Sequence, residues 1–110
     1  MAETQSELLQ GTLELLILKT LALEPMHGWG IAKRIGQLSK NVLAIQQGSL
    51  YPALYRLQDR GLIRSKKGVS DEGRAVKIYR LTPRGRRRLE DGTASWRLVS
   101  TAVEHVLQAT

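Results

Sequence analysis

Side chains that can bind a polyanion are concentrated in the middle of this 110-residue chain. One group falls in residues 49–57 and a second flanks a glycine-containing turn at residues 68–73. Hydroxyl, phenol, guanidinium and ammonium groups are donors that proteins use to bind phosphate oxygens. The pattern therefore indicates noncovalent binding rather than bond-making chemistry. The candidate binding residues are Ser49, Tyr51, Tyr55, Arg56, Lys66, Lys67, Arg74 and Lys77.

Positive charge is concentrated in the same region rather than spread along the chain. Residues 56–88 hold twelve Lys and Arg against three Asp and Glu, a net charge of +9. The rest of the chain holds five basic and seven acidic residues, a net charge of −2. A diffuse excess of lysine would favour solubility, whereas a concentrated one favours a polyanionic partner. The alternative is a solvated basic face without a partner.

The spacing of leucines predicts a helix beneath the first group. Leu50, Leu54 and Leu57 fall at i, i+4 and i+7, so they share one buried face of a helix over residues 49–57. The polar candidates point away from that face. Gly61 is expected to end the helix.

A basic hairpin is predicted to follow this helix. Residues 62–67 and 76–81 read as two arms that enclose turn residues 68–73. Tyr79 and Leu81 share one face of the second arm and are expected to pack inward. A helix that presents polar groups, followed by a basic hairpin, is typical of a winged helix-turn-helix that reads a DNA groove.

Each candidate residue also has a plainer interpretation. Ser49 is expected to bind phosphate at the helix N-terminus, to act as the N-cap, or both. Tyr51 and Tyr55 are expected to contact DNA, with packing of one of them on the wing as the alternative. Arg56 is expected to bind phosphate rather than a base. The cations beside the turn follow the DNA backbone, enter a minor groove or remain solvated.

Two helices are predicted before this region. Residues 8–23 are apolar around nearly the whole helix circumference, which predicts burial on more than one side and suggests cover by a second subunit. Residues 1–6 are expected to be frayed. The second helix covers residues 27–39, and residues 42–45 in the connector after it are a candidate third strand. The core stripe of the second helix is Ile31, Ile35 and Leu38.

A last helix is predicted to begin at Thr82, as N-cap, and Pro83, at the first helical position. Apolar or small residues recur in it with a/d spacing for about two and a half heptads. That is too short for a free coiled coil but long enough to pair with a second copy or with the first helix. The alternative is an intramolecular core stripe. The residues expected at a dimer and effector interface are Leu89, Gly92, Trp96, Val99 and Val103.

Trp96 is the largest side chain on this seam. We expect it to border a site for a small aromatic effector between two subunits, with plain dimer packing as the alternative. Gly92, one turn earlier, would leave space beside the indole.

Other classes of function find little support in the composition. The chain has no cysteine and only two histidines, His27 and His105, so neither a disulfide framework nor a zinc site of the usual spacing is expected. Neither a catalytic triad grouping nor a phosphate-binding glycine loop is present, so neither an enzyme nor a cofactor is predicted. The longest apolar run, residues 13–23, is too short to cross a bilayer, and the acidic N-terminus does not resemble a signal peptide. A cytoplasmic location is therefore expected.

The predicted fold is mainly α-helical with a small β-hairpin wing. Residues 1–82 are expected to form a winged helix-turn-helix DNA-binding domain. Residues 83–110 are expected to form a C-terminal dimerisation helix, the two parts being one compact unit.

Motifs distributed over nearly the whole chain resemble the PadR family of bacterial transcriptional regulators. Trp29 stands where the family usually has tyrosine, and Tyr55 where it often has histidine. The matching segments are Gly11-Thr12-Leu13-Glu14-Leu15-Leu16, His27-Gly28-Trp29-Gly30-Ile31-Ala32, Gly48-Ser49-Leu50-Tyr51-Pro52-Ala53-Leu54, Arg56-Leu57, Gly61-Leu62-Ile63 and Tyr79-Arg80-Leu81-Thr82-Pro83-Arg84-Gly85.

The resemblance implies a homodimeric repressor of the short subclass, which lacks the larger C-terminal helical domain of longer members. Such proteins release their operator DNA when a small aromatic or drug-like molecule, or another signal, reaches the dimer. The residues alone predict DNA binding and dimerisation, and they leave one alternative, a winged-helix module for protein interaction. Salt dependence separates the two, because phosphate contacts weaken steeply with ionic strength.

Overall fold

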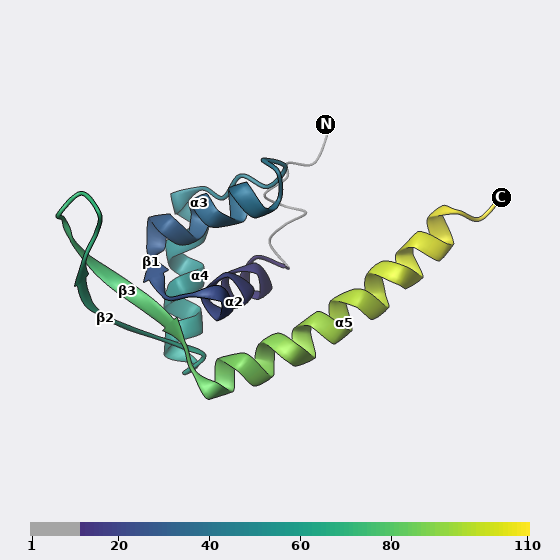
Figure 1. Cartoon of the computed structure of the whole chain (residues 1–110). Helices are drawn as coiled ribbons and strands as arrows, with labels where there is room; N and C mark the ends of the chain where they lie inside the picture. The colour runs from purple at the N-terminus through teal and green to yellow at the C-terminus, as the bar shows by residue number, and fades with distance from the viewer. Residues whose placement is uncertain (1–11) are drawn as a thin grey trace.

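The computed structural model describes residues 12–110, which form four helices and a three-stranded antiparallel sheet (Figure 1). The predicted class, mainly helical with a small β-wing, is confirmed. The expected frayed N-terminus and the predicted start of the first helix lie outside the described residues. The elements are α2 (Leu13–Leu23), β1 (Met26–His27), α3 (Gly28–Leu38), α4 (Gln47–Asp59), β2 (Ile63–Val69), β3 (Ala75–Leu81) and α5 (Pro83–Leu107).

Helix α2 lies at the centre of the molecule. Ile17, Leu18 and Leu21 are buried, and Leu15 and Leu16 are partly buried against the same core. The elements that contact α2 are α3, α4, β3 and α5 of the same chain. The prediction of a helix buried on more than one side is confirmed, and these four elements of the same chain supply cover on those sides.

Helix α3 follows the predicted pattern except at its end. Ile31 and Ile35 are buried, whereas Leu38 is 53% exposed, so its assignment to the core stripe is wrong. The reason is the turn directly after it, where Lys40 and Asn41 adopt positive φ angles of 55° and 66° and redirect the chain. The connector after α3 contributes Ile45 to the core instead, and this side chain is buried.

The third strand is β1 and not residues 42–45, so that prediction is also wrong. Met26 pairs with Tyr79 and His27 with Ile78, which gives the strand order β1-β3-β2. Both edges of β3 are therefore occupied, by β1 and β2, and residues 42–45 lie outside the sheet. The chain must run extended between Pro25, after the end of α2, and the start of α3, and this extended stretch lies beside β3.

The hairpin register confirms which side chains face inward. Ser65 pairs with Tyr79, and Lys67 with Lys77, so these four side chains lie on one face of the hairpin. The side chains of the pairs between them lie on the opposite face. Tyr79, on the first of these faces, is only 8% exposed. The turn is shorter than predicted, because β2 continues through Val69; it closes with a 2.8 Å bond from the Ser70 amide to the Arg74 carbonyl.

Helix α5 begins at a tight joint between four segments. The predicted cap is confirmed: the Thr82 hydroxyl accepts from the Gly85 amide at 3.0 Å and donates to the Gly61 carbonyl at 2.8 Å. The Thr82 amide also donates to the Leu62 carbonyl at 3.2 Å. A Cβ atom on Gly85 would overlap that same carbonyl oxygen. This approach requires glycine for lack of space, since the helical backbone itself would accept any residue.

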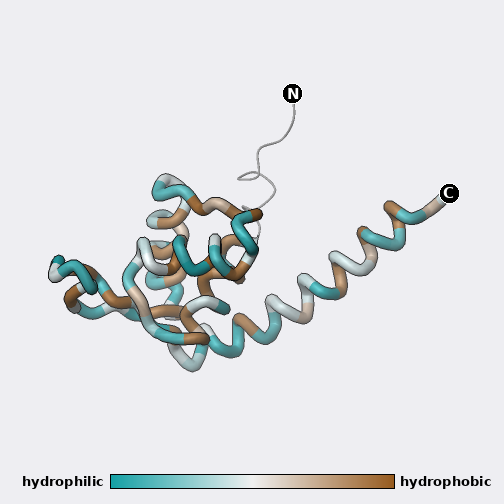
Figure 2. Tube along the Cα trace, turned by 45° about the horizontal axis from the view of Figure 1, so that its top comes forward, coloured by the Kyte–Doolittle hydropathy of each residue, from teal (hydrophilic) through white to brown (hydrophobic). Residues whose placement is uncertain are grey.

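The first turns of α5 pack on α2, and the remainder projects away from the body (Figures 1 and 2). Leu89 is buried, and Gly92 lies so close that a Cβ there would be 2.9 Å from Leu15 Cδ1. Farther along, Trp96 is 45% exposed and Val103 50% exposed. Apolar residues recur along this projecting part in Figure 2. The intramolecular alternative for the seam thus applies to its beginning alone.

We expect Gly85→Ala to lower the free energy of unfolding by about 3 kcal/mol, because backbone at Leu62 would have to move to admit the methyl group. Chemical denaturation measures this loss. Gly48→Ala is the matched control: a Cβ there meets nothing within 4 Å, and alanine in a helix should stabilise by roughly 0.5–1 kcal/mol. Equal stabilities of Gly85→Ala and the unchanged protein would contradict the proposed constraint.

Candidate nucleic-acid interface

Helix α4 buries one face and exposes the other. Leu50, Leu54 and Leu57 are at most 1% exposed, as the leucine spacing predicts. The helix begins at Gln47, with Gln46 as its N-cap residue, so the N-cap interpretation of Ser49 is wrong. Ser49 lies instead in the exposed first turn, where the amides and the helix dipole favour an anion.

The two tyrosines of α4 differ in their surroundings. Tyr55 is 76% exposed, whereas Tyr51 is 44% exposed and lies against the start of α3. A Cβ on Gly28 would be 2.9 Å from Tyr51 Cε1, so the ring has its place because Gly28 has no side chain. Burial, and secondarily the nearby Tyr51 phenol, raise the pKa of Tyr79 above its ordinary value of 10.0.

A groove of about 410 Å³ lies between the wing and the starts of α3 and α4. Tyr51 enters it from α4, and Arg74 and Lys77 line it from the hairpin. Trp29, which is 48% exposed, also lines the groove, as does Glu72, which sequence reasoning did not assign to the interface. His27, also in the wall, caps α3: its Nδ1 atom accepts from the Gly30 amide at 3.1 Å.

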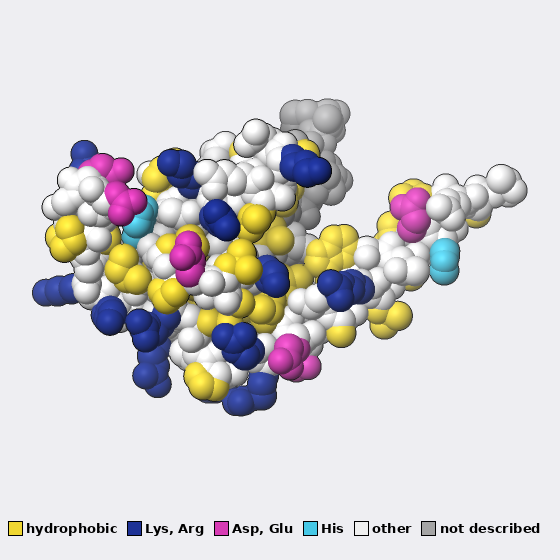
Figure 3. All heavy atoms as spheres, in the orientation of Figure 1, with side chains coloured by type: hydrophobic (Ala, Val, Ile, Leu, Met, Phe, Trp, Pro, Cys, Tyr) yellow, Lys and Arg dark blue, Asp and Glu magenta, His cyan; other side chains and the backbone are white. Residues whose placement is uncertain are grey.

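The wing cations occupy both faces of the hairpin. Lys67 and Lys77 are cross-strand partners on the face that carries Tyr79, while Lys66 points to the opposite face, as strand alternation requires. All the candidate wing cations are exposed, and within residues 12–110 none of them forms an ion pair. Dark blue side chains follow the hairpin on the left of Figure 3, with acidic ones at its tip.

Arg56 is the candidate whose surroundings differ most from expectation. Its Nε atom donates to Glu14 Oε2 at 2.9 Å, and Arg60 Nη1 donates to Glu14 Oε1 at 3.0 Å. At about 100° per residue, Arg56 lies about 140° around α4 from Tyr51. Glu14 was not predicted as part of the site, because 42 residues separate it from Arg56 and no periodicity connects them.

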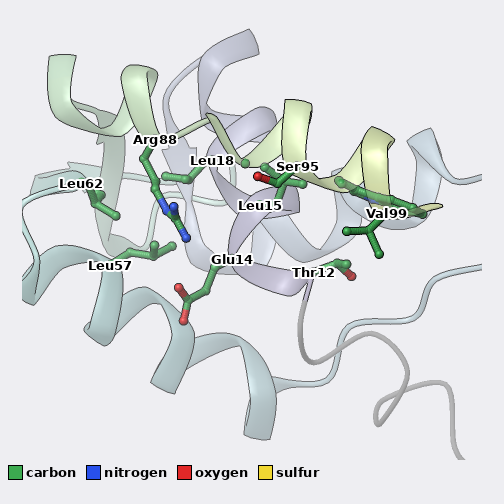
Figure 4. Close-up of a pocket in the computed structure, with 11 residues that line it drawn as sticks. Thr12, Glu14, Leu15, Leu18, Leu57, Leu62, Arg88, Ser95 and Val99 are labelled. Atoms are coloured by element: carbon green, nitrogen blue, oxygen red, sulfur yellow. The ribbon is translucent and has the colours of Figure 1, made fainter. Parts of the chain in front are cut away.

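A second cavity, of about 560 Å³, lies between α2, the end of α4 and α5 (Figure 4). It brings together three of the predicted effector residues, Gly92, Trp96 and Val99, whereas Leu89 belongs to the core. Val103 lies beyond the lining. Leucines of α2 and α4 form apolar walls, and Glu14 and Arg88 add charged groups that sequence reasoning did not assign.

The described residues offer little for other chemistry. Within residues 12–110, no three His, Asp or Glu side chains are grouped so that they could hold a metal ion. No helix in this part of the chain is long and apolar enough to cross a membrane.

The geometry defines the class of protein. A helix pair, α3 and α4, with an exposed hydroxyl-bearing face on α4 and a basic hairpin beside it, is a winged helix-turn-helix for duplex DNA. The model of the "Transcriptional regulator PadR-like family" matches residues 17–91. The chain belongs to this family, and its members are DNA-binding transcriptional regulators rather than enzymes.

Individual relatives agree with this assignment. A transcriptional regulator of Mycobacterium tuberculosis is 36% identical over 85 residues, which cover 77% of this chain and 76% of that protein. The crystal structure of a PadR-like transcriptional regulator from Bacillus cereus is similar with a TM-score of 0.80 and 32% identity, covering 96% of this chain and all of that one. A transcriptional regulator from Clostridium thermocellum gives a TM-score of 0.82 at 26% identity, covering 91% and 97% of the two chains.

Proposed function

We propose that this regulator is a cytoplasmic homodimeric repressor that binds operator DNA through α4 and the wing and is released by a small effector. One observation supports the DNA-binding part: the Tyr51 hydroxyl of α4 and two hairpin cations that form no ion pair within residues 12–110, Arg74 and Lys77, line the same groove. The competing proposal, a winged helix that binds protein, gives no account of a net charge of +9 in residues 56–88.

In the proposed complex, α4 enters the major groove. Tyr55 is the most exposed of its candidate side chains and reaches base edges or phosphates, with Tyr51 beside it. Ser49 binds a phosphate at the start of the helix. The hairpin cations, Lys66, Lys67, Arg74 and Lys77, follow the backbone on both sides of the wing. Arg56 contributes a phosphate contact when it leaves Glu14.

We expect the double variant Lys66→Ala/Lys67→Ala to reduce the slope of log affinity against log salt by up to about 2, because each lost phosphate contact removes about 0.9. Titration of labelled duplex DNA at several salt concentrations measures the slope. Lys19→Ala, on the exposed side of α2, removes a lysine outside α4 and the wing and should leave the slope unchanged. An unchanged slope in the double variant would remove both lysines from the interface.

The proposed dimer rests on the projecting part of α5. Trp96, Val99, Val103 and Val106 repeat with a/d spacing and are between 45% and 74% exposed in one subunit. A stripe of this length would pack against the same stripe of a second copy, which would remove the apolar side chains from water. The two copies of α4 would then be held at a fixed spacing on the operator.

We expect Val103→Asp to produce a folded monomer or misfolded protein, because the dimer would bury an unpaired carboxylate. Operator affinity should fall with it, since two half-sites are no longer bound together. Sedimentation at roughly micromolar concentration measures the oligomeric state of the variant, and circular dichroism shows whether the variant is folded. Thr101→Asp, on the face opposite the seam, is the matched control and should remain dimeric. A well-folded monomer of the unchanged protein would sink the proposal.

The proposed effector site is the cavity that Trp96 borders. Its walls combine an aromatic ring, leucines and two charged groups, which suits a small planar ligand that also carries a polar substituent. The site lies between α2, α4 and α5, so a ligand that binds two dimer arrangements unequally would change the spacing of the α4 helices. Plain packing of Trp96 between subunits is the competing interpretation.

We expect phenolic acids or cationic aromatic dyes to quench tryptophan fluorescence in Trp29→Ala but not in Trp96→Ala, because the two indoles lie in different sites. A bound compound should weaken operator affinity by about 5- to 150-fold, the usual range of coupling between sites. If nothing quenches through Trp96, or if the ligands that do so leave operator affinity unchanged, the tryptophan packs the dimer and the signal enters elsewhere.

A further inference from the structure

Within residues 12–110, Glu14 is the one carboxylate that forms ion pairs, with Arg56 of α4 and with Arg60, the residue that follows the helix. Arg56 and Arg60 donate to its two oxygens at 2.9 and 3.0 Å. These two arginines are among the twelve cations of residues 56–88, and within residues 12–110 the other ten form no ion pair. A single carboxylate of α2 therefore pairs with two of the twelve cations available to bind DNA.

The position of Glu14 is fixed by its own helix. It lies in the first turn of α2, where the helix dipole stabilises a carboxylate. Its neighbour Leu13 is 4% exposed and anchors that turn in the core. Figure 4 shows the Glu14 side chain directed from α2 toward α4, at the edge of the cavity.

The two arginines, by contrast, are free to exchange partners. Their side chains are 52% and 48% exposed, so they leave Glu14 without crossing a packed region. Exposed ion pairs are weak. Phosphate is a ligand that guanidinium binds in the same two-pronged geometry as a carboxylate. The balance between the two acceptors is therefore close.

We propose that Glu14 competes with DNA phosphates for Arg56 and Arg60, and so limits the sequence-independent part of DNA affinity. The inference rests on the proposed approach of α4 to duplex DNA. With Glu14 in place, the arginines add little to backbone binding, because each must give up a carboxylate to gain a phosphate. Without that carboxylate they add two phosphate contacts on DNA of any sequence.

The test is Glu14→Gln, which keeps the size of the side chain and removes its charge. On random-sequence duplex, we expect a salt slope steeper by up to about 2, so that a fourfold rise in salt costs about tenfold more affinity than in the unchanged protein. Glu104→Gln is the charge-matched control, because Glu104 lies near the end of α5 and is bonded to Gln108. Its slope should equal that of the unchanged protein.

A variant that lacks both arginines distinguishes the proposed competition from a purely structural role of Glu14. In Arg56→Gln/Arg60→Gln, the further change Glu14→Gln should leave the slope unchanged, since no arginine remains to be released. A slope that is the same in Glu14→Gln and in the unchanged protein overturns the proposal, as does a steeper slope that persists without the arginines. Both outcomes differ from failure of the α4–wing interface, which would show as a shallow slope in the unchanged protein itself.

Discussion

The close approach of Gly85 to the Leu62 carbonyl is the constraint on which the arrangement of the molecule depends. At this point the end of α4, the start of β2, the end of β3 and the start of α5 meet within a few residues. Thr82 bonds to Gly61 on one side and to Gly85 on the other, so the hairpin and α5 share one anchor. The direction of the wing and the direction of α5 are therefore set together.

Helix α4 carries three different environments around one short cylinder. Its leucines belong to the core, Ser49 and Tyr55 are exposed to solvent, Tyr51 lines the groove beside the wing, and Arg56 pairs with Glu14 of α2. The helix is thus the common element of the groove and of the cavity that Trp96 borders, to which Leu57 contributes. The groove and the cavity are therefore connected through the packed side chains of α4.

Local signals in the sequence were sufficient for most of the fold. The leucine spacing of α4, the hairpin arms and the Thr82 cap depend on residues a few positions apart, and all three are confirmed. The DNA-binding class followed from the same residues together with the concentrated charge. The exposed position of Leu38 depends instead on positive φ angles at Lys40 and Asn41, a conformation that asparagine adopts more readily than lysine.

What sequence could not provide is pairing between distant segments. Strand β1 has two residues, too few for a periodic pattern, and exists because β3 has an open edge beside it. The same limit applies to Glu14 with Arg56 and to the charged walls of the Trp96 cavity, Glu14 and Arg88, which come from different helices. Their proximity is a property of packing and has no signature in spacing.

The length of α5 makes it a lever. Its 25 residues extend about 37 Å, so a tilt of about 5° at the Gly85 joint moves the far end by about 3 Å. That displacement is comparable to the rise of one base pair, about 3.4 Å along the DNA axis. The joint is tightly packed, so the helix moves there as a rigid rod, and a small tilt becomes a larger displacement at its far end. In the proposed dimer, an arm of this kind would convert a slight repacking near α2 into a shift of about one base-pair step between the two α4 helices.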